Sequence, residues 1–328
     1  MPTDAICASM ENFRLKVFRV VASHLNFSRA AEELLLTQPA VTQQIKALED
    51  EFGVSLFDRS GGRIALTPAG QALLPYAEKL RAISEEAYAA VVSASGKLGG
   101  HLALGASQTI GQYVLPNLVA AFLRENPRVS ITAMSGNTDT ILGALVEHRI
   151  HLAMVEGPAL RKDIHTEPFM EDEMVLVVPA SHEWAEREIA LGDLRDAPML
   201  MREFGSGSRR VVENALRRAG LRKKELTTRM ELDSTEGLLS AVEAGLGVTF
   251  VSRWAVRSQL VLGTLKLARV RGLRLARKFS LAYPAGPEPT GSGGEFRLFL
   301  LTHSVKLMAA SAAPRVKMPH SGPARHSA

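Results

Sequence analysis

The 328-residue sequence predicts an all-α head with a short hairpin, then one long helix, then a two-lobed α/β domain. Apolar residues recur at helical spacing before residue 53, and the stretch from Pro68 to Ser95 contains no turn signal. From His101 onward, strand-like and helix-like segments alternate. A chain of this length usually divides into more than one domain, in agreement with these three parts.

Composition and charge set only broad bounds on the protein. With 46% hydrophobic and 22% charged residues, the chain is typical of a soluble globular protein, and no apolar run is long enough to span a membrane. The first residues lack a secretory-signal pattern and Cys7 is the only cysteine, so we expect a cytoplasmic protein. The net charge of +5 suggests a polyanionic partner, but the segment after His303 carries four basic and no acidic residues. The placement of charges is therefore more informative than their sum.

The head is predicted to hold three helices in residues 10–67. Phe13, Val17, Val20 and Val21 give the first helix its apolar stripe. The second helix, "RAAEELLL", follows Ser28 as its N-cap, and the third follows Thr37 and tolerates a proline in its first turn. Only "LTQ" separates the second helix from the third, which forces a large crossing angle typical of a helix-turn-helix.

The third predicted helix, within "LTQPAVTQQIKALE", begins with amides and hydroxyls instead of Lys and Glu. Such neutral donors and acceptors suit the edges of DNA bases in the major groove. We assign base readout to Gln38, Thr42 and Gln43. The first-turn residues Pro39 and Ala40 belong to the same surface, and phosphate contacts are assigned to Ser28, Arg29, Thr37 and Lys46. A small helical bundle with a merely solvated polar face is the alternative.

The segment "LFDRSGGRIALTPAG" predicts a hairpin, because two short apolar runs flank Gly61 and Gly62. A hairpin that follows a helix-turn-helix forms a wing. Arg59 and Arg63 flank its tip, from which they can reach the minor groove or the DNA backbone.

The whole stretch "FSRAAEELLLTQPAVTQQIKALEDEFGVSLFDRSGGRIALTPAG" resembles the winged helix-turn-helix of the LysR-type transcriptional regulators. The similarity includes the Ala-Ala of the second helix, "TQPAV", "ALE", "LF-R" and "LT-AG". It implies that double-stranded DNA is the partner of this head, and it favours the DNA interpretation over a solvated bundle.

The long helix and hinge are placed at residues 68–98. Two rows of residues, seven apart within each row, make an a/d seam over about three heptads; they are Leu73, Leu80, Ala87 and Tyr76, Ile83, Ala90. We predict a dimerisation helix, because a lone helix-turn-helix reads only a half-site; an amphipathic helix packed on its own chain is the alternative. The family resemblance also implies a homotetramer, and "SGKLGG" begins the hinge.

Repeated βαβ units predict a parallel sheet with helices on both faces in residues 99–303. The strands "HLALGAS", "VSITAMS" and "IHLAMVEG" alternate with helices at 108–125 and 137–148, and "EMVLVVP" opens a second series. Two such halves resemble the effector-binding part of the LysR family, which shares its fold with periplasmic binding proteins. We place lobe I at 100–162 and 268–303 and lobe II at 163–267.

Ligands of such folds bind beside the carboxyl ends of strands and the starts of helices. Four strand-to-helix junctions offer hydroxyls, free N–H groups and one arginine, a set that suits a small anion. These candidate effector ligands are Ser107, Gln108, Thr109, Ser135, Gly136, Asn137, Gly205, Ser206, Gly207, Ser208, Arg209, Ser234 and Thr235. Each junction alone is typical of an ordinary helix cap, but four in one two-lobed fold favour a binding cleft.

Within the family, "TIGQYVLP", "EPFMEDEMVLVVP" and "GSGSR" are most similar to the branch that controls sulfur assimilation, sulfite response and Calvin-cycle genes. By this resemblance, Ser107 and Thr109 stand where that branch places hydroxyl-bearing ligands. The implied effector is a sulfur oxyanion or a phosphorylated or carboxylated metabolite.

Signals for catalysis and cofactors are missing from the sequence. There is no P-loop, "GLGVTF" is too short for a dinucleotide fingerprint, and "GSGSRR" is not a nucleophile elbow. The histidines do not have metal-ligand spacing. We expect no metal, no cofactor beyond the small effector, and no enzyme activity; a DNA-binding domain fused to an α/β hydrolase or transferase is the alternative. Contact with RNA polymerase is left open, and residues 304–328 are expected to form a disordered basic tail.

Overall fold

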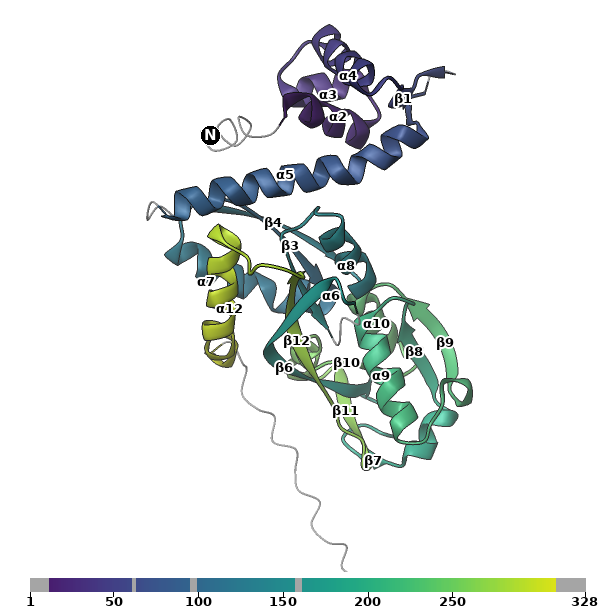
Figure 1. Ribbon diagram of the computed structural model, residues 1–328. Coiled ribbons are helices and arrows are strands. Elements are labelled where there is room, and N and C mark those ends of the chain that lie inside the picture. Colours follow the sequence, from purple (N-terminus) through teal and green to yellow (C-terminus); the bar gives the residue numbers. More distant parts are fainter. Residues whose placement is uncertain (1–11, 61–62, 95–98, 157–160, 311–328) are drawn as a thin grey trace, which may run out of the picture.

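The computed structural model describes residues 12–60, 63–94, 99–156 and 161–310 (Figure 1). The head consists of α2 (Phe13–His24), α3 (Phe27–Leu34) and α4 (Gln38–Phe52), followed by the antiparallel strands β1 (Phe57–Asp58) and β2 (Ala65–Leu66). The three helices and the hairpin are therefore confirmed, and the expected tip at 61–62 lies outside the described residues. Val17, Phe18 and Ile45 are fully buried at the centre of this head.

The cap of α3 differs from the sequence prediction. Asn26, not Ser28, is the N-cap, because its Oδ1 accepts hydrogen bonds from the backbone N–H groups of Ser28 and Arg29 at 2.9 and 3.1 Å. The helix therefore begins earlier than predicted, and Ser28 is exposed in its first turn. Thr37 caps α4 as predicted, with its Oγ1 3.4 Å from Ala40 N.

The turn between α3 and α4 contains a strained residue. Leu35 adopts φ +55°, the left-handed region that side chains with a Cβ disfavour. Its side chain is 92% exposed, so packing contributes little to offset the strain. This conformation ends α3 and turns the chain into α4, which sets the angle between the two helices.

The long helix α5 (Pro68–Ala94) joins the head to the α/β domain (Figure 1). Near its start, Ala77 is buried in the head core and Leu73 packs against that core. Farther along, Arg81 Nη2 donates a hydrogen bond to the carbonyl of His148 in lobe I at 3.2 Å. The Ala90 side chain and the expected hinge at 95–98 lie outside the described residues.

Lobe I is built on three parallel strands: β3 (Gly100–Ser107) pairs with β4 (Val129–Gly136) on one side and β5 (Leu152–Glu156) on the other. Its helices are α6 (Gln108–Tyr113), α7 (Leu115–Glu125), α8 (Thr138–Val146) and α12 (Gly291–Ala310). The helix expected at 108–125 is thus two helices, which break at Val114 just before Pro116 in the first turn of α7. The ring of Phe122 meets that of Phe296 edge-on at 5.0 Å in the lobe core.

Lobe II contains a second set of short elements. Its strands are β7 (Glu188–Ile189), β8 (Pro198–Arg202), β9 (Thr227–Leu232), β10 (Thr249–Ser252) and β11 (Leu265–Val270). Its helices are η2 (Leu191–Arg195), α9 (Gly207–Arg218), η3 (Lys223–Glu225), α10 (Thr235–Glu243) and α11 (Arg257–Leu262).

Two long antiparallel strands run through both lobes: β6 (Ile164–Pro179) and β12 (Leu275–Pro284). The main sheet has the order β4-β3-β5-β12-β6-β11-β7, with β10 also paired to β6, so it is mixed, not purely parallel as expected. Strand β11 pairs with the second half of β6 and with β7. Residues 268–274 therefore lie with lobe II, and the return crossover occurs in β12 instead of at residue 268.

The C-terminal helix is longer than expected. Residues 304–310, assigned to the tail from the sequence, belong to α12, and Ser304 is buried with its Oγ donating to Phe169 O at 2.8 Å. The remaining tail, 311–328, lies outside the described residues. No helix in the described ranges has the length and apolarity to cross a membrane.

Replacing Leu35 with Asn should raise the free energy of unfolding of the head by about 1 kcal/mol, because Asn tolerates the left-handed region and no buried contact is lost. Hydrogen exchange of the α3 and α4 amides in the full-length protein should slow roughly fivefold. Leu35→Ala lacks the polar group with which Asn hydrogen-bonds locally in this region, so it should change nothing; equal slowing by Ala would show that strain is not the cause.

Candidate DNA-binding face and effector cleft

Most of the residues predicted to meet DNA are exposed on the head. Gln38, Gln43 and Lys46 are exposed along α4, and Thr42 is half-buried between them. The Thr42 hydroxyl donates to the carbonyl of Gln38 at 3.0 Å, so its donor is used within the helix. Its methyl group is the part that can contact a thymine methyl. Ser28, Arg29, Thr37 and Pro39 are exposed as well, and Ala40 is half-buried.

Arg59 fixes the wing against the helices. Its guanidinium lies 4.7 Å from the centre of the Phe27 ring and 3.5 Å from the carboxylate of Glu49 in α4. Glu49 also accepts hydrogen bonds from the backbone N–H groups of Leu56 and Phe57, at 2.8 and 3.2 Å. The base of the wing is therefore rigidly joined to α4, while Arg63 on its far side stays exposed.

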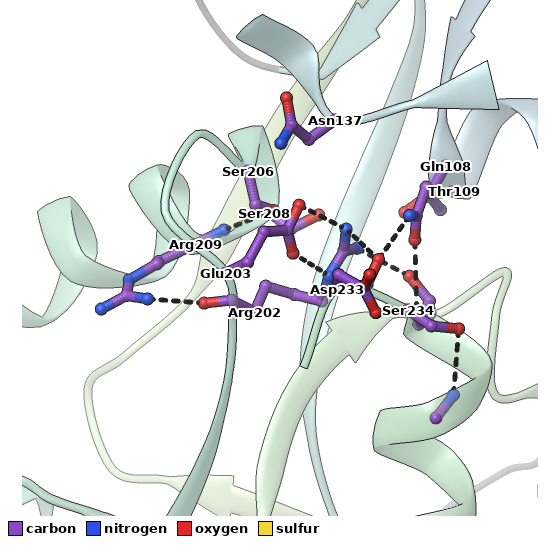
Figure 2. Close-up of polar contacts among 12 residues, drawn as sticks. Gln108, Thr109, Asn137, Arg202, Glu203, Ser206, Ser208, Arg209, Asp233 and Ser234 are labelled. Atoms are coloured by element: carbon purple, nitrogen blue, oxygen red, sulfur yellow. Dashed lines mark hydrogen bonds and ion pairs between the residues drawn. The ribbon is translucent and has the colours of Figure 1, made fainter. Parts of the chain in front are cut away.

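The two lobes meet directly at the predicted cleft (Figure 2). The Gln108 amide bridges from lobe I to lobe II: its Nε2 donates to Asp233 O at 2.5 Å, and its Oε1 accepts from Thr235 N at 3.3 Å. At the other side of the boundary, Arg210 in α9 pairs with Asp139 in α8 at 2.8 Å.

Several predicted cleft residues serve as helix caps. Asn137 accepts from Thr140 N at 2.9 Å, Ser206 from Arg209 N at 3.4 Å, and Ser234 from Gly237 N at 3.2 Å. These three positions are thus explained by local structure, although Asn137 and Ser206 still lie near the boundary between the lobes (Figure 2). Ser135 is exposed at the end of β4, and Gly136 follows it.

Arg209 does not face the cleft as the sequence suggested. Its buried guanidinium donates to Arg202 O at 2.7 Å and pairs with Glu213 at 2.8 Å and Glu231 at 2.9 Å, all within lobe II. Hydrogen bonds to these carboxylates hold the pKa of Arg209 above its usual range. Arg209 therefore ties α9 to β8 and β9, while Gly205 precedes the helix with φ +91°.

A second buried arginine lies beside Thr235. Arg202 donates to Thr235 Oγ1 at 2.9 Å and to Asp233 O at 3.4 Å, and it pairs with the neighbouring Glu203 at 2.8 Å (Figure 2). The start of α10 is thereby held by lobe II itself. Tyr113 of lobe I adds a cross-lobe hydrogen bond to Glu236, and burial together with this bond raises the pKa of Tyr113.

The most buried charges of the cleft were not among the predicted residues. Arg277 of β12 stands directly opposite Asp172 of β6 and pairs with it at 2.7 Å. The same guanidinium pairs with Glu156, the last residue of β5, at 2.8 Å, and contacts Ser208 Oγ at 2.9 Å. Ser208 also donates to Glu156, and Ser252 donates to Asp172 at 2.8 Å. One arginine thus joins lobe I, lobe II and both crossover strands.

The two carboxyl groups share this arginine unequally. Burial disfavours the ionised form of Glu156, but the charge of Arg277 and hydrogen bonds from Ser208 and Thr109 outweigh it, so the pKa of Glu156 lies below its usual range. Burial raises the pKa of Asp172, and Arg277 offsets this only in part. Arg277 therefore compensates the burial of Glu156 more fully than the burial of Asp172.

Strand alternation carries the signal that could have located this cluster. Arg277 shares its face of β12 with the buried Leu275 and Phe279, and Asp172 shares its face of β6 with Met170 and Met174. A charge at an inward position of a strand needs a buried partner. Pairing Arg277 with Asp172 required the strand register, which the sequence alone does not supply.

Replacing Arg277 with Met should lower the free energy of unfolding of the α/β domain by about 3–5 kcal/mol, because two buried carboxyl groups lose their shared cation. Thermal unfolding of the full-length protein measures this loss. Arg210→Met, which breaks the exposed pair with Asp139, should cost less than about 1 kcal/mol. Equal effects of the two substitutions would contradict a central role for the buried cluster.

Comparison with known proteins covers both parts of the chain. Residues 13–71 match the bacterial regulatory helix-turn-helix protein model of the lysR family, and residues 95–304 match the LysR substrate binding domain. Among the described residues, no group of three or more His, Cys, Asp or Glu side chains could hold a metal ion.

Relatives and a solved structure agree with these matches. The chain is 34% identical to a probable RuBisCO transcriptional regulator of Cyanophora paradoxa, over 86% of this chain and 87% of the relative. It is also 34% identical to the HTH-type transcriptional regulator CysL of Bacillus subtilis, over 81% and 88%. A full-length OxyR variant from Pseudomonas aeruginosa superposes with a TM-score of 0.67 at 25% identity, covering 90% of this chain and 94% of that one. This chain belongs to the LysR family and is a LysR-type DNA-binding transcriptional regulator.

Proposed function

We propose that this regulator acts in the cytoplasm as a dimer that assembles into a tetramer, and that a small anionic metabolite in the interlobe cleft controls it. The observation that carries the DNA part is the exposed amide and hydroxyl face of α4, held beside a wing that Arg59 fixes in place. RNA polymerase is a further partner that such a regulator would contact at a promoter.

The dimer is supported by an apolar stripe on α5. Tyr76, Leu80, Ile83 and Val91 are 67%, 50%, 50% and 69% exposed in the single chain, and the first three of them belong to the predicted seam. A second copy of α5 would cover this stripe. Pairing two heads would give two half-sites on the DNA.

The effector proposal is supported by the buried hydroxyls at the lobe boundary. Ser107, Thr109 and Ser208 are each at least 95% buried, and they come from both lobes. A ligand that bound here would favour one arrangement of the lobes by its differential affinity for the two states. Arg81 of α5 donates a hydrogen bond to the His148 carbonyl in lobe I. A movement of lobe I would therefore be transmitted to the helix that carries the DNA-binding head.

A regulatory role without catalysis is supported by the extent of the family matches. They cover residues 13–71 and 95–304, and the stretch between them belongs to the single helix α5. The relatives are regulators by name, of RuBisCO in one case.

The DNA proposal predicts that Gln43→Ala lowers affinity for the DNA beside the protein's own gene by about 5- to 150-fold, since a bidentate base contact is worth about 1–3 kcal/mol. Fluorescence anisotropy at one stated salt concentration measures the change. Gln44→Ala is the matched control, because Gln44 lies on a different side of α4 and is half-buried. Unchanged affinity for Gln43→Ala, or equal losses for both variants, would rule out base readout by Gln43.

The dimer proposal predicts that Leu80→Glu combined with Ile83→Glu separates the subunits, because four like charges would then face each other across the seam. Sedimentation velocity of the full-length protein should show the smaller species, and DNA affinity should fall with it. Lys79 is exposed and lies outside the predicted seam, so Lys79→Glu should leave the assembly intact. A double variant that sediments like the wild type would place the interface elsewhere.

A further inference from the structure

The carboxylate of Glu156 is held by donors from three parts of the fold. Its Oε1 accepts a hydrogen bond from the backbone N–H of Thr109 in lobe I, at 3.1 Å. Its Oε2 pairs with Arg277 of the crossover strand at 2.8 Å and accepts from Ser208 of lobe II. We call this set of donors the Glu156 seat. Glu156 itself is only 3% exposed.

The donors of the Glu156 seat are those that proteins use for a free oxyanion: a guanidinium, a hydroxyl and a backbone N–H. The seat also has unused capacity. Arg277 Nη2 and Ser107 Oγ are buried and have no hydrogen-bond partner, although Ser107 lies close enough to Glu156 to lower its pKa. A carboxylate has two oxygens, whereas a tetrahedral oxyanion has four to offer these donors.

The packing of α9 against the end of β5 keeps a donor of the seat on the Glu156 carboxylate. A Cβ at Gly207, in the first turn of α9, would lie 2.3 Å from the Glu156 carbonyl oxygen and 2.5 Å from Thr138 Oγ1. Only a glycine allows α9 to approach β5 this closely, and this approach places Ser208 of α9 on the Glu156 carboxylate, so an oxyanion would have to displace the carboxylate from this donor. Repulsion between two buried negative charges acts in the same direction.

We infer that Glu156 determines the ligand specificity of the cleft: its carboxylate is the chain's own occupant of an oxyanion seat and excludes free inorganic oxyanions from it. This inference rests on the proposed function, because the cleft is the proposed effector site, and it narrows the effector class there. Glu156 excludes free sulfate, sulfite and phosphate from the seat. The effector class that remains is an organic anion with contacts elsewhere in the cleft.

The test removes the Glu156 carboxylate by substitution and measures whether sulfate then binds in its place. Calorimetric titration of full-length Glu156→Ala with sodium sulfate, at constant ionic strength, should show saturable binding at least roughly tenfold tighter than for the wild type. Binding heat is the suitable readout, because sulfate raises the unfolding temperature of many proteins without binding a site. The matched control is Asp139→Asn, which removes one negative charge at the same lobe boundary but outside the seat. It should behave like the wild type.

Glu156→Thr keeps a polar side chain while freeing space, and it should show the same gain if the alanine variant folds poorly. Three results would overturn the inference. The wild type could bind sulfate as tightly as the variants do, Asp139→Asn could show an equal gain in sulfate affinity, or neither Glu156 variant could show any gain. The titration needs no DNA, so failure of the proposed regulatory function would appear separately, as a wild-type protein that does not select its own promoter.

Discussion

The arrangement of the α/β domain depends on one buried cation. Arg277 lies on the strand between β5 and β6, and it forms an ion pair with a carboxyl group from each neighbour, Glu156 and Asp172. Through Ser208 the same group reaches the first turn of α9 in the other lobe. Buried charges are tolerated only when their partners are close and well oriented, so this cluster restricts how the two lobes can sit on their crossover strands. The boundary between the lobes is therefore shaped by the protein's own ion pairs.

The linker helix places this domain in physical contact with the DNA-binding head. One end of α5 contributes Ala77 to the head core, and farther along Arg81 bonds to the His148 carbonyl of lobe I. A cavity of about 210 Å³ lies at the same junction, lined by Ile83 of α5 and by His101 and Tyr283 among others. The junction is thus less tightly packed than the cores on either side, and small rotations of lobe I against α5 are compatible with intact cores.

Much of this architecture could be predicted from the sequence, and the failures have physical reasons. Local signals were sufficient for α4, because Thr37 and Pro39 mark the start of this helix in the sequence. They failed for Arg209, because a glycine-serine turn before an arginine looks the same whether the guanidinium faces a cleft or, as here, Glu213 and Glu231. Local sequence signals also did not reveal the cluster around Arg277. Its partners Glu156 and Asp172 lie 121 and 105 residues away in the chain, and only the strand register brings them next to it.

In the dimer proposed above, two copies of α4, held by paired α5 helices, read DNA as a unit. A DNase I footprint of the full-length protein on the intergenic DNA beside its own gene tests this most directly. We expect two protected half-sites on one face of the duplex, their centres separated by a whole number of helical turns. A single half-site, or uniform weak protection across the fragment, would contradict the claim.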